Sequence, residues 1–83
     1  MLEQLNTQRK VVGIKQLRRA LKEGKITMVF AAGNADPGLT APLEAECGQY
    51  GVELVWVPTM HELGKACGIS VGASAAGLLT EAE

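Results

Sequence analysis

The stretch VELVWVPTMHELGKACGISVGASAAGLL, residues 52–79, predicts a strand, a helix and a second strand in succession. Residues 52–57 form a largely apolar run that predicts a strand, and Pro58 is expected to end it. Thr59 and Glu62 follow at the spacing of a capping box, in which two side chains satisfy backbone amides that lack partners at the start of a helix. The unit is typical of a sheet covered by helices.

The end of this stretch predicts how closely the sheet packs. Gly68 is expected to end the helix, because glycine readily adopts the left-handed conformation that follows a last helical turn. Residues 70–79 are small, apolar and partly alternating. They predict a last strand that approaches its neighbours so closely that only Ala and Gly side chains fit.

The same alternation of helices and strands continues towards the N-terminus. The expected elements are a short amphipathic helix (2–10), a stub of strand (11–12), a helix (14–23), a buried strand (26–32), a loop (33–38) and a helix (39–50). Pro42 is expected in or near the first turn of the last of these helices, and Gly51 at its end. We therefore predict an α/β fold, a three-layer α-β-α sandwich with a four-stranded mixed sheet, in which residues 1–83 form a single domain.

The composition favours a small globular protein with an aliphatic core. Of the 83 residues, 47% are apolar and only 4% are aromatic, which excludes a disordered chain and a disulfide scaffold. The apolar runs are too short to span a bilayer, and the first ten residues lack the apolar segment of a secretory signal. Cys47 and Cys67 form no CxxC pair, so we expect two buried thiols in a reduced, cytoplasmic protein rather than a redox pair.

Charge is distributed unevenly along the chain. Residues 1–25 contain seven Lys and Arg against two Glu, a net charge of +5. Residues 26–83 contain one Lys against seven acidic residues, a net charge of −6. One end of the chain would therefore attract a polyanion that the other would repel.

The pentapeptide GISVG, residues 68–72, has the G-x-S-x-G pattern found around the nucleophile of many serine hydrolases. A nucleophile elbow needs a strand that enters the serine and a helix that leaves it. Here the predicted order is the reverse, and the only histidine, His61, precedes Ser70 instead of following it. We therefore do not predict a catalytic serine.

His61 and the neighbouring glycines do not indicate a metal or nucleotide site. His61 has no second histidine or thiol cluster to complete a zinc site, so we expect it on the surface. Gly64, Gly68 and Gly72 do not follow a strand in a GxGxxG or GxxxxGK pattern. No metal and no cofactor are predicted.

One stripe of the predicted helix 14–23 is strongly basic. Its four cations recur at helical spacing: Lys15, Arg18, Arg19 and Lys22. A solvated helix face would explain this pattern. The alternative is an anion site, because no acid interrupts the stripe before Glu23 and Gly13 lets a phosphate approach the amides of the first turn.

Three separated motifs resemble one protein family. They are the helix start GIKQLRRAL (13–21), the loop NADP (34–37) and the stretch ELGKACGISVGASAAGLL (62–79). In this order they are similar to the L7Ae and L30e superfamily of large-subunit ribosomal proteins, and more closely to its small bacterial members, which bind kink-turn RNA. The resemblance covers nearly the whole chain, roughly from Val12 to Leu79.

The resemblance implies that the first basic helix enters the widened major groove at the kink and reads tandem sheared G·A pairs. Gly13 would lie where a phosphate approaches, with Lys15, Gln16 and Arg19 at base edges and phosphates. Asp36, the acid before the proline of the NADP loop, would meet an extruded nucleotide.

The resemblance also gives the GISVG loop a role against the three-nucleotide bulge of the RNA. Ile69 and Val71 would support unstacked bases, and Ser70 would supply a hydrogen bond, in keeping with the preference for reading RNA where bases are splayed out. The alternative is that Ile69 and Val71 begin a buried strand. The complete set of predicted RNA-binding residues is Gly13, Lys15, Gln16, Arg19, Lys22, Asp36, Glu62, Lys65, Ile69, Ser70 and Val71.

The function predicted is that of a non-enzymatic RNA-binding protein that recognises a kink-turn in ribosomal RNA, a riboswitch or a messenger leader. The ribosome is a further candidate partner, and no membrane partner is expected. The acidic second half and the scarcity of aromatic residues leave an alternative, a protein-interaction module of the same fold that has lost RNA binding. A third hypothesis, a small hydrolase, rests on GISVG alone.

Overall fold

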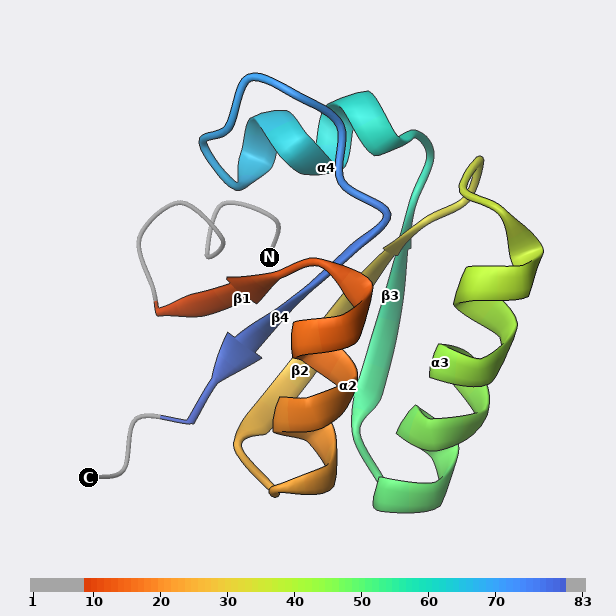
Figure 1. The fold of residues 1–83 in the computed structure, drawn as a ribbon, viewed down its shortest axis with the longest axis vertical. Helices are drawn as coiled ribbons and strands as arrows, with labels where there is room; N and C mark the ends of the chain where they lie inside the picture. Colours follow the sequence, from red (N-terminus) through yellow and green to blue (C-terminus); the bar gives the residue numbers. More distant parts are fainter. Residues whose placement is uncertain (1–8, 81–83) are drawn as a thin grey trace.

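The computed structural model describes residues 9–80 of the chain (Figure 1). Its elements are β1 (Lys10–Val12), α2 (Ile14–Lys22), β2 (Ile26–Ala32), α3 (Pro37–Tyr50), β3 (Glu53–Val57), α4 (Met60–Ala66) and β4 (Ala75–Leu79). The short helix predicted at residues 2–10 falls mostly outside the described residues. Its last residue, Lys10, belongs to β1 instead.

The four strands form one mixed sheet in the order β1-β4-β2-β3. β4 runs antiparallel to both of its neighbours, β1 and β2, whereas β2 and β3 are parallel. The parallel pair needs a crossover, which α3 provides. The predicted four-stranded mixed sheet is confirmed.

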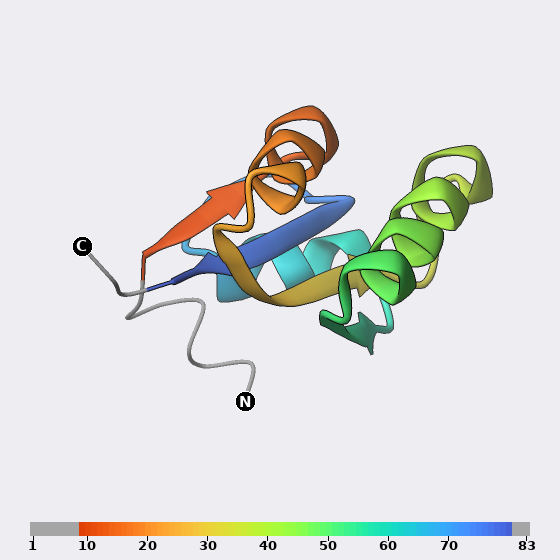
Figure 2. The same ribbon diagram turned by 90° about the horizontal axis from the view of Figure 1, so that it is seen from below.

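Helices cover both faces of this sheet, which makes the predicted α-β-α sandwich (Figure 2). On one face, α2 and α3 pack against the sheet through a cluster that includes Leu17, Leu21 and Leu43. On the other face, α4 buries Leu63 and Cys67 against a cluster that includes Phe30. Successive strand residues point to opposite faces, so a single strand such as β2 contributes to both cores.

Helix α3 begins at Pro37 and not at residue 39, so the predicted loop is two residues shorter. Asp36 is its N-cap, and the Asp36 carboxylate accepts a hydrogen bond of 2.9 Å from the Gly38 amide. Pro37 fits the first helical position because its missing amide donor has no partner there in any case. Pro42 therefore lies inside the helix and not in its first turn, whereas Gly51 ends the helix in the left-handed conformation, as predicted.

Strand β4 begins at Ala75 and not at residue 70. The preceding residues are a loop whose first part bonds to α4: the Ile69 amide donates to the Gly64 carbonyl at 3.1 Å, and the Ala73 amide to the Met60 carbonyl at 3.0 Å. Its last residue, Ser74, bonds to the sheet through its carbonyl. The prediction of very close packing holds for β4 itself. A Cβ at Gly77 would overlap the Leu17 side chain.

Both cysteines are free and buried, as predicted. Burial raises the pKa of the Cys47 and Cys67 thiols above its ordinary value, which disfavours the reactive thiolate. Within residues 9–80, none of the helices is both long and apolar enough to cross a membrane.

Candidate nucleic-acid interface

Four segments that are distant in the sequence meet at one edge of the sheet. The strand register places Val12 beside Ala76, Ala31 beside Ala75, and Ala32 beside Val57. β1, β2 and β3 therefore end, and β4 begins, at the same edge. The start of α2, the loop 33–36, the start of α4 and the loop 69–74 all lie along it (Figure 1).

Backbone hydrogen bonds join these segments to one another. The Gly13 amide donates to the Ala75 carbonyl at 3.0 Å, and the Ala32 amide donates to the Ser74 carbonyl at 2.9 Å. Gly13 has φ of +111°, a conformation that side chains with a Cβ rarely adopt, and no atom would meet a Cβ there. Conformation, and not crowding, thus explains glycine at the turn that starts α2.

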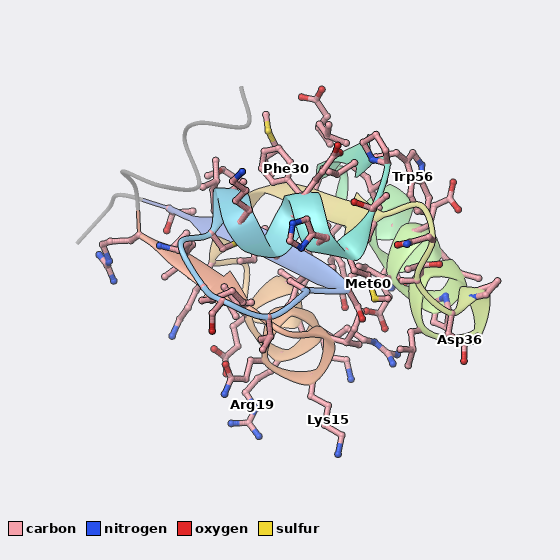
Figure 3. The ribbon with its side chains drawn as sticks, turned by 90° about the horizontal axis from the view of Figure 1, so that it is seen from above. Lys15, Arg19, Phe30, Asp36, Trp56 and Met60 are labelled. Atoms are coloured by element: carbon pink, nitrogen blue, oxygen red, sulfur yellow. The ribbon has the colours of Figure 1, made fainter. Side chains whose placement is uncertain are left out.

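Helix α2 separates its apolar and basic residues. Leu17 and Leu21 are buried, whereas the predicted contact residues Lys15, Gln16 and Arg19 are exposed. The Lys15 and Arg19 side chains project outwards from the helix (Figure 3). The basic stripe borders a shallow depression lined by Lys15, Arg18, Arg19 and Lys22. This surface offers exposed cations, which suit phosphate groups.

Within residues 9–80, Arg18 is the one cation of the stripe that forms an ion pair. Its Nε donates to Glu46 Oε1 at 3.1 Å and its Nη2 donates to Glu46 Oε2 at 2.8 Å. Glu46 belongs to α3, so this fork joins the two helices that cover the same face. The hydrogen bond from Arg18 holds the pKa of Glu46 below its ordinary value. The sequence pattern could not distinguish Arg18 from its neighbours, since Glu46 lies 28 residues away.

The loop 69–74 exposes the apolar side chains that were expected to support bases. Ile69 is 37% exposed and Val71 is 67% exposed. Ser70 between them is also exposed. The alternative in which Ile69 and Val71 begin a buried strand is therefore wrong.

Two glycines allow this loop to lie directly on α4. A Cβ at Gly64 would overlap the Val71 carbonyl oxygen, and a Cβ at Gly72 would come within 3.2 Å of Met60 Cβ. These roles were not predicted. The motif ELGKACGISVGASAAGLL contains Gly64, but only the folded loop shows that the close contact there is with Val71.

The loop 33–36 holds the start of α4. The side-chain oxygen of Asn34 accepts a hydrogen bond of 2.8 Å from the Met60 amide, and Thr59 Oγ1 accepts one of 3.1 Å from the Glu62 amide, as the capping box predicts. Asn34 was not among the predicted site residues, although it lies in the NADP motif. Asp36 is exposed at the start of α3 with one oxygen engaged by Gly38, and Met60 is partly buried against the cluster beneath α4.

Helix α4 carries the remaining predicted residues. Glu62 and Lys65 are both exposed and stand three positions apart, so they share one side of the helix. His61 is exposed, as expected. Among the described residues, no group of three or more His, Cys, Asp and Glu is placed to hold a metal ion. Ser70 lies between a helix and a strand, the reverse of the order in a nucleophile elbow.

Comparison with known proteins agrees with this architecture. The RNA-binding protein YbxF of Geobacillus stearothermophilus is 44% identical over 69 residues, which are 83% of this chain and 84% of that protein. The large ribosomal subunit protein eL8 of Halobacterium salinarum is 32% identical over 68 residues, 81% of this chain and 57% of that protein. Among solved structures, the Giardia lamblia 15.5kD RNA binding protein superposes with a TM-score of 0.87 at 26% identity, over 96% of this chain and 68% of that one. The model of the ribosomal protein L7Ae/L30e/S12e/Gadd45 family matches residues 2–83, and the chain belongs to this family.

Proposed function

We propose that this protein binds RNA without catalysing a reaction, and that it recognises a kink-turn. The observation that carries the proposal is the meeting, at one edge of the sheet, of an exposed basic helix and an exposed apolar loop. A fully paired duplex would contact only the basic helix, because its bases are stacked and paired. An RNA that kinks and splays out bases would contact both the helix and the apolar loop.

Phosphates and base edges would meet α2. Lys15 and Arg19 supply charge-assisted hydrogen bonds, and Gln16 supplies an amide that both donates and accepts. Lys22 extends the same basic surface towards the end of the helix. No atom lies within 4 Å of the position of a Cβ at Gly13, which leaves room for a phosphate near the first turn.

Splayed bases would meet the other segments of the edge. Ile69 and Val71 offer apolar contact, Ser70 a hydrogen bond, and Asp36 an acceptor for an extruded nucleotide. Glu62 and Lys65 on α4 would border the bound backbone, with Lys65 adding one more cation.

The relatives support this reading. The similar proteins from Geobacillus and Giardia are named as RNA-binding, and the halobacterial one as a component of the large ribosomal subunit. We therefore propose ribosomal RNA, a riboswitch or a messenger leader as the target of a single domain formed by residues 1–83, which acts in the cytoplasm, with the ribosome as a further candidate partner.

The test compares two RNAs of equal length, a kink-turn duplex and a fully paired duplex, by titration calorimetry at several salt concentrations. We expect clear preference for the kink-turn. With about four phosphate contacts, log K falls by roughly 3–4 per tenfold rise in salt. Equal affinity for the two RNAs contradicts kink-turn recognition. Absence of binding to either one favours the protein-interaction module, which a pull-down from lysate would then address.

A further inference from the structure

The ion pair between Arg18 and Glu46 lies beside the cations that we propose to contact RNA, and the Arg18 side chain lines the same shallow depression as they do. Both oxygens of Glu46 are engaged by the Arg18 guanidinium, at 3.1 and 2.8 Å. The Glu46 side chain is only 16% exposed, whereas that of Arg18 is 40% exposed. The donor edge of the guanidinium is therefore directed at α3, and the carboxylate is largely covered.

Glu46 has a second cation close by. Lys22 follows Arg18 by four positions, so the two side chains are neighbours on the surface of α2. Both Arg18 and Lys22 lower the pKa of Glu46, with the larger contribution from the Arg18 hydrogen bond. The fork of Arg18 matches a carboxylate better than the point charge of lysine does. Arg18 consequently holds Glu46 and leaves Lys22 exposed to solvent.

We propose that Arg18 is a positioning residue for RNA binding, which acts through Glu46 and does not itself contact the RNA. By occupying the carboxylate, Arg18 prevents Glu46 from capturing Lys22 and from presenting an unpaired negative charge beside the phosphates. The inference rests on the proposed function, because it assumes that the basic surface of α2 meets RNA phosphates.

A double-mutant cycle tests this assignment with Arg18→Met, Glu46→Gln and the double variant. Methionine keeps an aliphatic stem and removes the charge. We expect Arg18→Met to weaken binding about fivefold to tenfold, since it leaves the carboxylate unpaired beside the phosphates. The double variant is expected to bind within about twofold of the parent, since nothing then captures Lys22.

Salt dependence separates this role from a purely structural one. Capture of Lys22 in Arg18→Met removes one phosphate contact, so the slope of log K against log salt becomes shallower by about 0.7–0.9. The double variant regains the parental slope. A loss of stability without a role in binding lowers the melting temperature and leaves the slope unchanged.

Arg19 provides the matched control, since it is exposed on the same helix. Arg19→Met is expected to weaken binding, and adding Glu46→Gln is not expected to restore it. If the Arg18→Met, Glu46→Gln double variant is as weak as Arg18→Met alone, Arg18 contacts the RNA directly and the proposal is overturned. Should Arg18→Met fail to fold, the affinity of the double variant still decides, with parent-like binding in support and loss of binding against.

Both the kink-turn and the paired duplex are used throughout the cycle. Equal affinity of the parent for the two RNAs removes kink-turn recognition, yet the cycle on either RNA still decides the role of Arg18. A parent that binds neither RNA overturns both proposals.

Discussion

Helix α2 and the loop 69–74 border the same edge of the sheet but are positioned by different means. The helix is fixed by its own apolar stripe, in which Leu17 and Leu21 are buried, and its outward side chains are free to vary. The loop has no such stripe. Backbone hydrogen bonds to α4 hold the loop in place, and the lack of a Cβ at Gly64 lets it lie against that helix. The Ile69 and Val71 side chains remain exposed.

The two surfaces are therefore expected to respond differently to mutation. On α2, binding depends on the ends of long charged side chains, so substitutions there should change affinity and leave the fold intact. In the loop, binding depends on both the apolar side chains and the backbone path beneath them. Substitutions in the loop, in the glycine beneath it and in α2 test this contrast, and they differ in the size of the expected effect.

Ile69→Asp or Val71→Asp should nearly abolish RNA binding. Each change removes the burial of an aliphatic side chain, worth up to about 1.5–3 kcal/mol, and sets a negative charge beside phosphates, so we expect a loss of more than about 3 kcal/mol. Binding is measured by calorimetry, with thermal melts as the folding control. Tyr50→Asp, a change at an exposed apolar residue at the far end of α3, is the matched control and should bind like the parent. Parental affinity of both loop variants would contradict a role for the loop in binding.

Gly64→Ala should displace the loop without replacing any predicted contact residue. The added methyl group would overlap the Val71 carbonyl, which is backbone and cannot rotate away. We expect a loss of about 1–3 kcal/mol in the free energy of unfolding, together with weaker RNA binding. Denaturant melts measure the first and calorimetry the second.

Gly48→Ala is the control for Gly64→Ala, because Gly48 also lies in a helix and no atom would meet its Cβ. It should raise the free energy of unfolding by about 0.5–1 kcal/mol, the ordinary benefit of alanine in a helix. Equal free energies of unfolding of the two variants would show that the loop moves to accommodate a methyl group at Gly64 without loss of stability.

Lys15→Ala and Arg19→Ala should each weaken kink-turn binding by about 1–3 kcal/mol, the range for a hydrogen bond to a charged group. Circular dichroism should not change, because both side chains are exposed on the basic stripe. Lys25→Ala, beyond the other end of α2, is the control and should bind nearly as well as the parent. If both helix variants bind like the parent, the contact surface does not include α2.

Ser70→Ala should have the smallest effect. It removes at most one hydrogen bond, about 0.5–1.5 kcal/mol, and leaves the apolar side chains beside it in place. The measurement is the same calorimetric titration, with an ester-cleavage assay alongside. A Ser70→Ala variant that folds normally but binds less well than Ile69→Asp would reverse the expected order and favour a different role for the serine.

The amino-acid sequence by itself determined the order of elements and the layers of this fold. Helical periodicity predicted α2, and apolar runs predicted the strands β2 and β3, although Val57 alone of the β3 residues is buried. Thr59 predicted the start of α4 because capping is a local interaction. The exposed cations of α2 could be predicted from the helical periodicity. They lie on the side of a helix whose other side must be buried.

The path of residues 69–74 and the pairing of Arg18 depend on tertiary contacts. The small apolar residues of 70–79 are compatible with a strand, but the local pattern could not specify the hydrogen-bond partners of their backbone groups. The amide of Ala73 in the loop bonds to α4, whereas β4 pairs with its neighbouring strands. The sequence did not distinguish Arg18 from the other cations of the stripe, because its partner Glu46 lies on α3, 28 residues away. In both cases the deciding contact joins segments that are separate in the chain, so its energy cannot be read from either segment alone.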